Sequence, residues 1–279
     1  MNAEKYNKLE KQGIRLEEIE VIKQFDRITN NKDVSFRIDR DNRICELLIQ
    51  DTGIKFLPDE IEAFTDLEIL SISDKGIKFL PNSIKKLKNL KDIAITKSSI
   101  EALPDYIGYL PNLKSLGVIN SKLTEFPLQI CALSSIESLQ LSNNKISYLP
   151  DCIGNLKCLR TLFLNNNQIE TLPNSFCELS KLHQLWLDDN KLKSLPKDFW
   201  NLNEINNIHI ANNKLETLPS SFSKIPRPLM LYLQNNSFIE VPKVLYDLRI
   251  TSLNLSGNPI TLFPKKIGTV TLKKKGIYQ

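Results

Sequence analysis

The chain contains few of the residue types that carry out acid–base or nucleophilic chemistry. It has only two histidines, His183 and His209, and Asp188 lies between them in the sequence. If Asp188 and His209 occupy neighbouring strands, they would form an exposed ion pair, the closest approach here to a catalytic base and its orienting group. No Gly-rich phosphate loop and no HExxH motif occurs in the sequence. The sequence therefore predicts no catalytic residues and no enzyme activity.

The cysteines give no stronger indication of a reactive or metal site. They form neither a CxxC pair nor a Cys/His cluster with zinc-ligand spacing, so we expect no metal and no cofactor. Their number is odd and no pair staples the ends of the chain, which favours unpaired, buried thiols and a reducing compartment. The cysteines are Cys45, Cys131, Cys152, Cys158 and Cys177.

Composition limits the remaining classes of protein. With 279 residues, of which 41% are hydrophobic and 25% charged, the chain can fold around a large core. Its apolar runs are too short for a transmembrane helix, and its charged first residues lack the apolar segment of a secretory signal. This start and the unpaired cysteines favour the cytoplasm. A signal peptide removed ahead of Met1 would instead make the protein secreted or surface-bound.

The net charge is concentrated near the C-terminus. Five lysines there account for the whole formal charge of +5, because residues 264–279 contain no acid. A nucleic-acid-binding protein needs a basic stripe across its binding face, so nucleic acid is disfavoured as a partner. We expect these residues to form a solvated basic tail. The lysines are Lys265, Lys266, Lys273, Lys274 and Lys275.

An internal repeat organises the chain and must position any functional side chain. Copies of the pattern LxxLxLxxNxLxxLPxxIxxLxx recur at a spacing of 23 residues, so that residues 44–267 hold ten of them. The copy that begins at Pro228 is one residue short. The other copies begin at Ile44, Leu67, Leu90, Leu113, Ile136, Leu159, Leu182, Ile205 and Ile250.

Each copy carries the pattern of one short strand and one short turn. The fourth and sixth positions, such as Leu162 and Leu164, alternate with polar residues, which indicates a strand with one buried face. Pro173, Phe176 and Leu179 then have the approximate spacing of a helical turn that faces the same core. One copy cannot bury its apolar face alone, but stacked copies form a continuous core.

The segment "LRTLFLNNNQIETLPNSFCELSK", residues 159–181, carries the whole pattern and resembles the leucine-rich repeat family. Its LPxxI half resembles the 23-residue subclass found in many bacterial and Ras-suppressor-type proteins. The resemblance implies an α/β solenoid: a curved right-handed coil with a parallel concave sheet and short turns or helical pieces on the convex side. Such proteins usually bind other proteins, so it also implies a protein or peptide partner, with a host protein among the candidates.

Asparagine usually occupies the ninth position, where the resemblance implies that it points inward and bonds the backbone. The first four copies instead have Thr52, Lys75, Ser98 and Ser121. Lys75 offers no acceptor and would be costly to bury, so we expect residues 44–121 to be less rigid than the rest. The asparagines are Asn144, Asn167, Asn190, Asn213, Asn236 and Asn258.

Both ends of the repeat array need a cap. At the N-terminus, residues 1–43 should supply a helix over 16–28, with its apolar side formed by Ile19, Ile22, Phe25 and Ile28, and a hairpin that turns at Asp41 and Asn42. At the C-terminus, residues 268–279 should add a last strand through Val270 and Leu272. We therefore expect one structural domain, and a monomer.

The fifth position of each copy should point to the concave face, between the two inward residues. Four consecutive copies place a ring there, and we call Phe163, Trp186, His209 and Tyr232 the aromatic ladder. Neighbouring strands lie about 4.8 Å apart, so these rings should be adjacent. The same row holds Leu48, Ser71, Ala94 and Gly117 in the early copies, then Gln140, and ends at Asn254.

Two explanations of the aromatic ladder compete. Aromatic residues support one another across a sheet, which is a purely structural role. Clustered exposed rings within a polar rim are also typical of binding surfaces, and we favour this interpretation. The predicted binding site is the aromatic ladder with Asp188, Asn165, Gln234 and Gln140, and Gln184, Asn207 and Met230 lie around it. The eighth position, which includes Asp74 and Asp189, should line one rim.

The sequence therefore predicts a non-catalytic module that binds a protein or peptide through its concave face. A glycan ligand is the first alternative, because aromatic faces lined by amides also suit sugar rings. A structural scaffold with no ligand on its inner face is the second.

Overall fold

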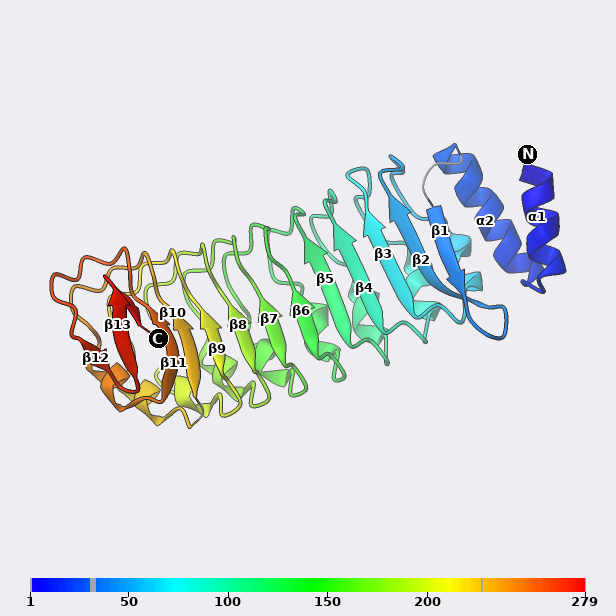
Figure 1. Ribbon diagram of the computed structural model, residues 1–279. Helices are drawn as coiled ribbons and strands as arrows, with labels where there is room; N and C mark the ends of the chain where they lie inside the picture. Colours follow the sequence, from blue (N-terminus) through cyan, green and yellow to red (C-terminus); the bar gives the residue numbers. More distant parts are fainter. Residues whose placement is uncertain (1, 31–33, 227, 279) are drawn as a thin grey trace. The chain divides into compact units, whose positions relative to one another are not determined.

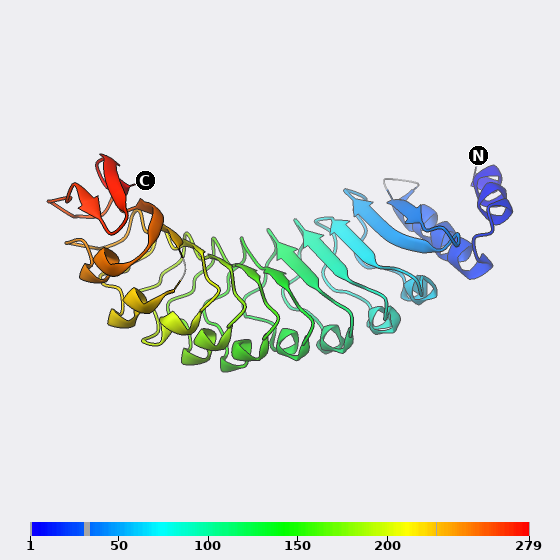
Figure 2. The same cartoon turned by 60° about the horizontal axis from the view of Figure 1, so that its bottom comes forward.

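The computed structural model describes residues 2–30, 34–226 and 228–278. The structure divides into two compact units, Met1–Leu123 (unit 1) and Thr124–Gln279 (unit 2). Within each unit, the chain forms stacked coils that have strands on one side and short 3-10 helices on the other (Figures 1 and 2). The predicted repeat fold is therefore confirmed, whereas the single structural domain stays a prediction.

Unit 1 begins with two helices and a hairpin, and continues as parallel coils. The helices are α1 (Asn2–Lys11) and α2 (Leu16–Thr29). Strand β1 (Val34–Ile38) pairs antiparallel with β2 (Ile44–Gln50), and the turn between them holds Asn42 at a φ of 58°. The strands that follow in parallel are β3 (Ile69–Ser73), β4 (Asp92–Thr96) and β5 (Ser115–Ile119). The 3-10 helices are η1 (Asp59–Ala63), η2 (Asn82–Lys86) and η3 (Asp105–Tyr109).

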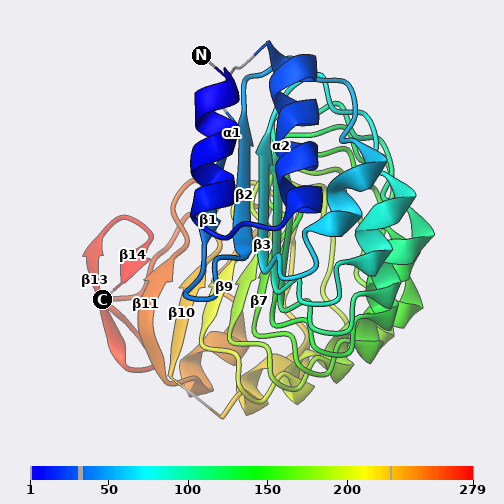
Figure 3. The same ribbon diagram turned by 90° about the vertical axis from the view of Figure 1, so that its right-hand side faces the viewer.

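The N-terminal cap confirms the predicted helix and adds another. Ile19, Ile22 and Phe25 of α2 are buried, but Ile28 is 42% exposed, so its assignment to the apolar side was wrong. Helix α1 has no strong apolar pattern and was not predicted. It lies beside α2 (Figure 3), held by Asp26, whose carboxylate accepts hydrogen bonds from Lys5 at 2.7 Å and from the Tyr6 hydroxyl at 2.8 Å.

Unit 2 contains six parallel strands and a C-terminal cap. The parallel strands are β6 (Ser138–Gln140), β7 (Thr161–Phe163), β8 (Gln184–Trp186), β9 (Asn207–His209), β10 (Leu229–Tyr232) and β11 (Ile250–Asn254). The 3-10 helices are η4 (Leu128–Ala132), η5 (Asp151–Asn155), η6 (Asn174–Glu178), η7 (Phe199–Asn201), η8 (Ser220–Lys224) and η9 (Lys243–Asp247). Among the residues that the structure describes, no helix is both long enough and apolar enough to cross a membrane.

The C-terminal cap covers the last coil with antiparallel strands. Strand β13 (Val270–Lys274) confirms the predicted strand through Val270 and Leu272, although it is not the last one, and it pairs with β12 (Lys266–Ile267) and β14 (Ile277–Tyr278). Strand β14 in turn pairs with β11. The five lysines of this region are exposed, as expected of a solvated terminus, and they lie on or beside this folded cap.

The core of unit 2 follows the predicted alternation. Leu162 and Leu164 have no exposed surface, and neither do Phe176 and Leu179 from the turn of the same coil. Full burial of such a side chain contributes about 1.5–3 kcal/mol. The same place in the next coils holds Phe199 and Phe222. Phe199 stacks on Phe176, and Phe222 stacks on Phe199. Strands and turns therefore share one continuous core.

The interior asparagines of unit 2 bond the backbone of two coils, as expected. The Oδ1 of Asn190 accepts the Ile169 N–H at 3.0 Å, from the preceding coil. Its Nδ2 donates to the Leu164 carbonyl of that coil at 2.9 Å and to the Leu187 carbonyl of its own coil at 3.1 Å. Asn167, Asn213, Asn236 and Asn258 make similar bonds across coils. These side chains satisfy groups that the bending backbone would otherwise leave unpaired.

Unit 1 solves the same problem with a carboxylate. Asp74 is 1% exposed, whereas Lys75 is exposed, so the inward position has moved by one residue and the rim position predicted for Asp74 was wrong. The Asp74 carboxylate accepts bonds from the Thr52 hydroxyl and from the N–H groups of Gly53 and Gly76, each at 2.8 Å. A Cβ on Gly76 would lie 2.2 Å from the Ile54 carbonyl oxygen, so only glycine permits this close backbone approach.

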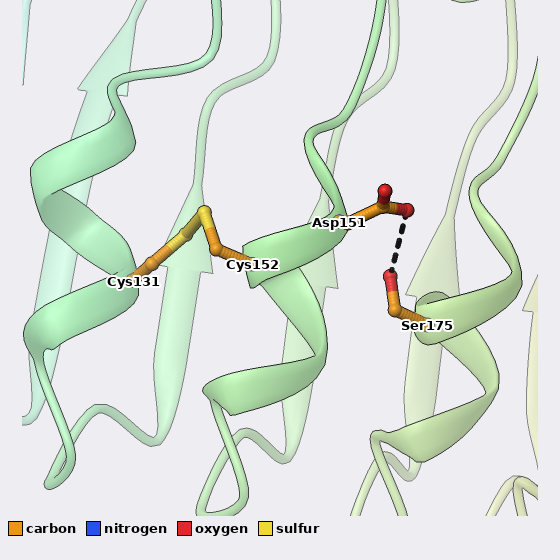
Figure 4. Close-up of a disulfide and its surroundings, with 4 residues drawn as sticks. All are labelled: Cys131, Asp151, Cys152 and Ser175. Carbon is orange, nitrogen blue, oxygen red and sulfur yellow. Dashed lines mark hydrogen bonds between the residues drawn. A yellow bond between two sulfur atoms is a disulfide. The ribbon is translucent and has the colours of Figure 1, made fainter.

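One pair of cysteines departs from the prediction. Cys131 of η4 and Cys152 of η5 form a disulfide across 5.7 Å between their Cα atoms, so their assignment as unpaired thiols was wrong (Figure 4). The bond joins the outer turns of two successive coils. On the far side of η5, the Ser175 hydroxyl donates to Asp151 at 3.5 Å (Figure 4). Cys45, Cys158 and Cys177 are free.

Removal of the disulfide with the double variant Cys131→Ser/Cys152→Ser should lower the free energy of unfolding by about 2–4 kcal/mol, because it releases a constraint on the unfolded chain. Chemical denaturation under oxidising conditions measures this loss. Cys158→Ser is the control and should change it little. If the oxidised wild type and the double variant unfold at the same denaturant concentration, the bond contributes nothing.

Candidate functional site

The sheet of unit 2 brings the four rings of the aromatic ladder into register. Phe163 pairs with Trp186, Trp186 with His209, and His209 with Tyr232, on strands β7 to β10 (Figure 1). Alternation along each strand explains this placement, because each ring lies between two inward aliphatic residues. Gln140 and Asn254 continue the row at its two ends. In unit 1, the corresponding row of Leu48, Ser71, Ala94 and Gly117 is also in register but has no rings.

The rings of the aromatic ladder stack on one another. The centroids of Trp186 and His209 are 3.8 Å apart with the planes inclined by 10°, and those of His209 and Tyr232 are 4.2 Å apart at 20°. Phe163 lies 5.5 Å from Trp186 and is tilted by 38°. All four side chains are half-buried. Because ring faces contact ring faces, the ladder presents mainly its ring edges to a ligand.

Two polar rows flank the aromatic ladder. Neither row contains lysine or arginine, and Asp188 is the only carboxylate in them. The predicted site residues Asn165 and Gln234 lie in one row with Asp188. Backbone hydrogen bonds join the successive coils that carry this row. That row comprises Ser142, Asn165, Asp188, Ala211, Gln234 and Ser256, and the other comprises Ser138, Thr161, Gln184, Asn207, Met230 and Ser252. The structure therefore brings all eight predicted site residues onto one face of unit 2.

Asp188 and His209 approach each other but do not form the expected exposed ion pair. Their side chains are only 17% and 16% exposed, and the shortest separation, from Nδ1 to Oδ2, is 3.7 Å. Burial lowers the pKa of His209 to about 4 and raises the pKa of Asp188 to about 6. At pH 7 the imidazole is therefore neutral and the carboxylate ionised. The other Asp188 oxygen accepts the Ala211 N–H at 2.6 Å.

Several polar atoms around the aromatic ladder are shielded from water and have no hydrogen-bond partner in the protein. They are Trp186 Nε1 and three carboxamide oxygens, on Asn165, Asn207 and Gln234. An unpaired buried polar group costs about 1–3 kcal/mol. Position in the repeat identified these residues from the sequence, but it carried no signal of their unpaired state. Elsewhere on the surface, His183 contacts the Lys181 carbonyl at 2.7 Å and Glu204 at 3.4 Å, away from the ladder row.

The site offers no arrangement for metal chemistry. Within residues 2–30, 34–226 and 228–278, no group of three or more His, Cys, Asp or Glu side chains is placed to hold a metal ion. The side chains of the site can donate and accept hydrogen bonds, present aromatic edges and supply one negative charge.

Comparison with known proteins gives consistent results for the fold. A family model described as "Leucine-rich repeat region" matches residues 128–192, and one described as "Leucine Rich Repeat" matches residues 249–269. No curated protein sequence matches the chain. Among solved structures, a leucine-rich repeat protein of Leptospira interrogans is 29% identical with a TM-score of 0.73, and the match covers 76% of this chain and 54% of that one.

Two further structures are similar at lower identity and therefore show the fold alone. The internalin InlF of Listeria monocytogenes is 19% identical with a TM-score of 0.60, covering 73% of this chain and 65% of that one. A plant ice-binding protein is 20% identical with a TM-score of 0.70, covering 89% and 88%. This chain thus spans about half of the Leptospira protein and less than two thirds of the internalin. The repeat, the geometry of the coils and the matched family models together support a leucine-rich repeat fold for this chain.

Proposed function

We propose that the protein is a non-catalytic binding module that takes a protein or peptide on the concave face of unit 2, at the aromatic ladder. The observation that carries the proposal is the stack of four half-buried rings in register on β7 to β10, flanked by amide-bearing rows. Partly buried aromatic side chains within a polar rim are typical of the residues that dominate binding energy. Similarity to an internalin is compatible with this role.

The stacking favours a peptide over a glycan. A sugar ring binds an aromatic side chain through an open ring face, but Trp186 and Tyr232 each have a face covered by His209. An extended peptide can instead contact ring edges and exchange backbone hydrogen bonds with the amides. A scaffold with no ligand would gain nothing from the unpaired polar atoms, because each lowers its stability.

A matched pair of tryptophan variants tests the site. Trp186 belongs to the aromatic ladder, whereas Trp200 lies in η7 on the opposite side of the coil and is 36% exposed. A displayed library of linear peptides is selected on the wild-type protein, and affinities of the recovered peptides are measured by titration. Trp186→Ala should weaken them by about 30-fold or more, which corresponds to about 2 kcal/mol, and Trp200→Ala should not.

Folding of the variants must be followed in parallel. Trp186→Ala should also lose about 0.5–1.5 kcal/mol of stability for each ring contact removed. Tyr232→Ala removes only one contact, to His209, and serves as a second test of the same surface. If the peptides bound folded Trp186→Ala and folded Tyr232→Ala as tightly as they bind the wild type, the proposal would be contradicted. A glycan array screened alongside would establish the alternative if it gave binding that depends on Trp186.

A further inference from the structure

Asp188 is a desolvated charge that no cation of the described structure balances. It is the only carboxylate on the two polar rows and the aromatic ladder of unit 2, and these rows carry no lysine or arginine. His209 is the nearest basic group, but its Nδ1 is 3.7 Å away, too far for a good hydrogen bond. Only Oδ1 is committed, to the Ala211 N–H. The other oxygen, Oδ2, therefore lacks the cationic partner that a buried carboxylate normally has.

The groups around Asp188 are mostly acceptors. Carboxamide oxygens of Asn165, Asn207 and Gln234 have no donor, whereas Trp186 Nε1 is the single donor without an acceptor. The oxygens are buried, but each of these residues is partly exposed as a whole. Rotation of the amide groups can therefore present the oxygens to a ligand. A ligand that is rich in donors and positively charged would satisfy the acceptors of this set, and a peptide carbonyl beside it would accept the Trp186 Nε1–H.

We propose that an arginine side chain of the bound protein or peptide docks at Asp188, beside the aromatic ladder. A guanidinium supplies five N–H donors in one plane and forms paired hydrogen bonds with carboxylates. Lysine has three donors on a more strongly hydrated ammonium group, so it matches this site less well. The inference rests on the proposed function and adds the chemical class of the ligand group.

A small probe tests the arginine site without a known partner. The chain has two tryptophans, so a Trp200→Phe background leaves one indole N–H signal, that of Trp186, in a nitrogen–proton NMR spectrum. Nα-acetylarginine amide is titrated into this protein, with the acetyl amides of lysine and citrulline in parallel. Citrulline has nearly the shape of arginine and no charge. The arginine probe should move the Trp186 signal, lysine less, and citrulline least.

Two aspartates provide the matched variants. Asp188→Asn removes the charge but keeps an oxygen for the Ala211 N–H, and Asp189→Asn removes an equal charge from the exposed neighbour. Affinity for the arginine probe should fall about 10-fold or more in the first variant, as expected for a charge-assisted hydrogen bond of about 1.5–3 kcal/mol. It should stay within about 2-fold in the second. An unchanged affinity in folded Asp188→Asn, or no response to arginine, would overturn the inference.

The wild-type protein offers a test without substitution at Asp188. Lowering the pH from 7.5 to 5 should protonate Asp188, whose pKa is about 6, and release the probe. The titratable groups facing Asp188 are His209, which stays neutral above its pKa of about 4, and the exposed Asp189, while Asn165 does not titrate. Selected peptides that depend on Trp186 but contain no arginine and bind Asp188→Asn equally would defeat only this inference. Peptides indifferent to Trp186 would defeat the proposed function itself.

Discussion

Replacement of Asn190 with alanine should lower the free energy of unfolding by about 3–5 kcal/mol, the largest effect expected of a single polar residue in unit 2. The variant would leave the Ile169 N–H without a partner. It would also remove one of the two asparagine bonds at each of the Leu164 and Leu187 carbonyls, which keep those from Asn167 and Asn213. Asn190 itself is 8% exposed, so water can replace these bonds only if the coils separate. The unpaired N–H costs about 1–3 kcal/mol and each of the two lost bonds to a carbonyl about 0.5–1.5 kcal/mol, which together account for the size of the effect.

An exposed asparagine controls for the loss of the amide. Asn174, the first residue of η6, is exposed, and Asn174→Ala should change stability by less than about 0.5 kcal/mol. Denaturant titration monitored by circular dichroism gives both values. Hydrogen exchange adds a local test, because the Ile169 amide should lose its protection first in Asn190→Ala. A loss below about 1 kcal/mol would mean that the interior bonds of Asn190 are not important for the stacking of the coils.

The repeat made most of the site predictable from the sequence. Equal spacing places the same position of each copy in register, and alternation within each strand decides which face that position takes. These two regularities located Phe163, Trp186, His209 and Tyr232 on one face, together with Asn165, Asp188 and Gln234. What they do not determine is side-chain orientation. The stacking of the rings, the burial of the pair Asp188 and His209, and the unpaired carboxamide oxygens all depend on rotamers.

Features that break the repeat were missed for identifiable reasons. Cys131 and Cys152 are 21 residues apart, not the 23 of the repeat, so their turns must be seen in three dimensions before the two thiols are known to face each other. Helix α1 is mostly polar, and its attachment depends on Asp26 of another helix. Ile28 has the spacing of the buried face and lies near the end of α2, but its side chain is exposed.

The second copy shows the same limit within the repeat itself. The repeat pattern predicts Lys75 at the inward ninth position, where its side chain would leave backbone groups unpaired. The chain instead turns Asp74 inward and Lys75 outward, because only the carboxylate can accept the three bonds that this coil requires. A carboxylate cannot donate as an asparagine amide does, so unit 1 lacks at this coil the bonds to carbonyl groups that stabilise unit 2.

Replacement of Asp74 with alanine should therefore destabilise unit 1 by about 3–5 kcal/mol at neutral pH, since two backbone N–H groups and the Thr52 hydroxyl lose a charged acceptor. Burial alone would raise the pKa of Asp74, but the bonds from Gly76, Thr52 and Gly53 outweigh it and hold the pKa below its ordinary value. A carboxyl with a lowered pKa in the folded state stabilises fully above its unfolded pKa of about 3.9 and loses that contribution as the pH falls further. The difference in unfolding free energy between wild type and Asp74→Ala should thus be constant from pH 7 to about 5 and shrink below about 4.

Asp105 is an exposed aspartate at the start of η3, so Asp105→Ala is the control and should show neither effect. A difference that grew as the pH fell would mean that Asp74 is protonated in the folded protein and that the three bonds do not outweigh its burial.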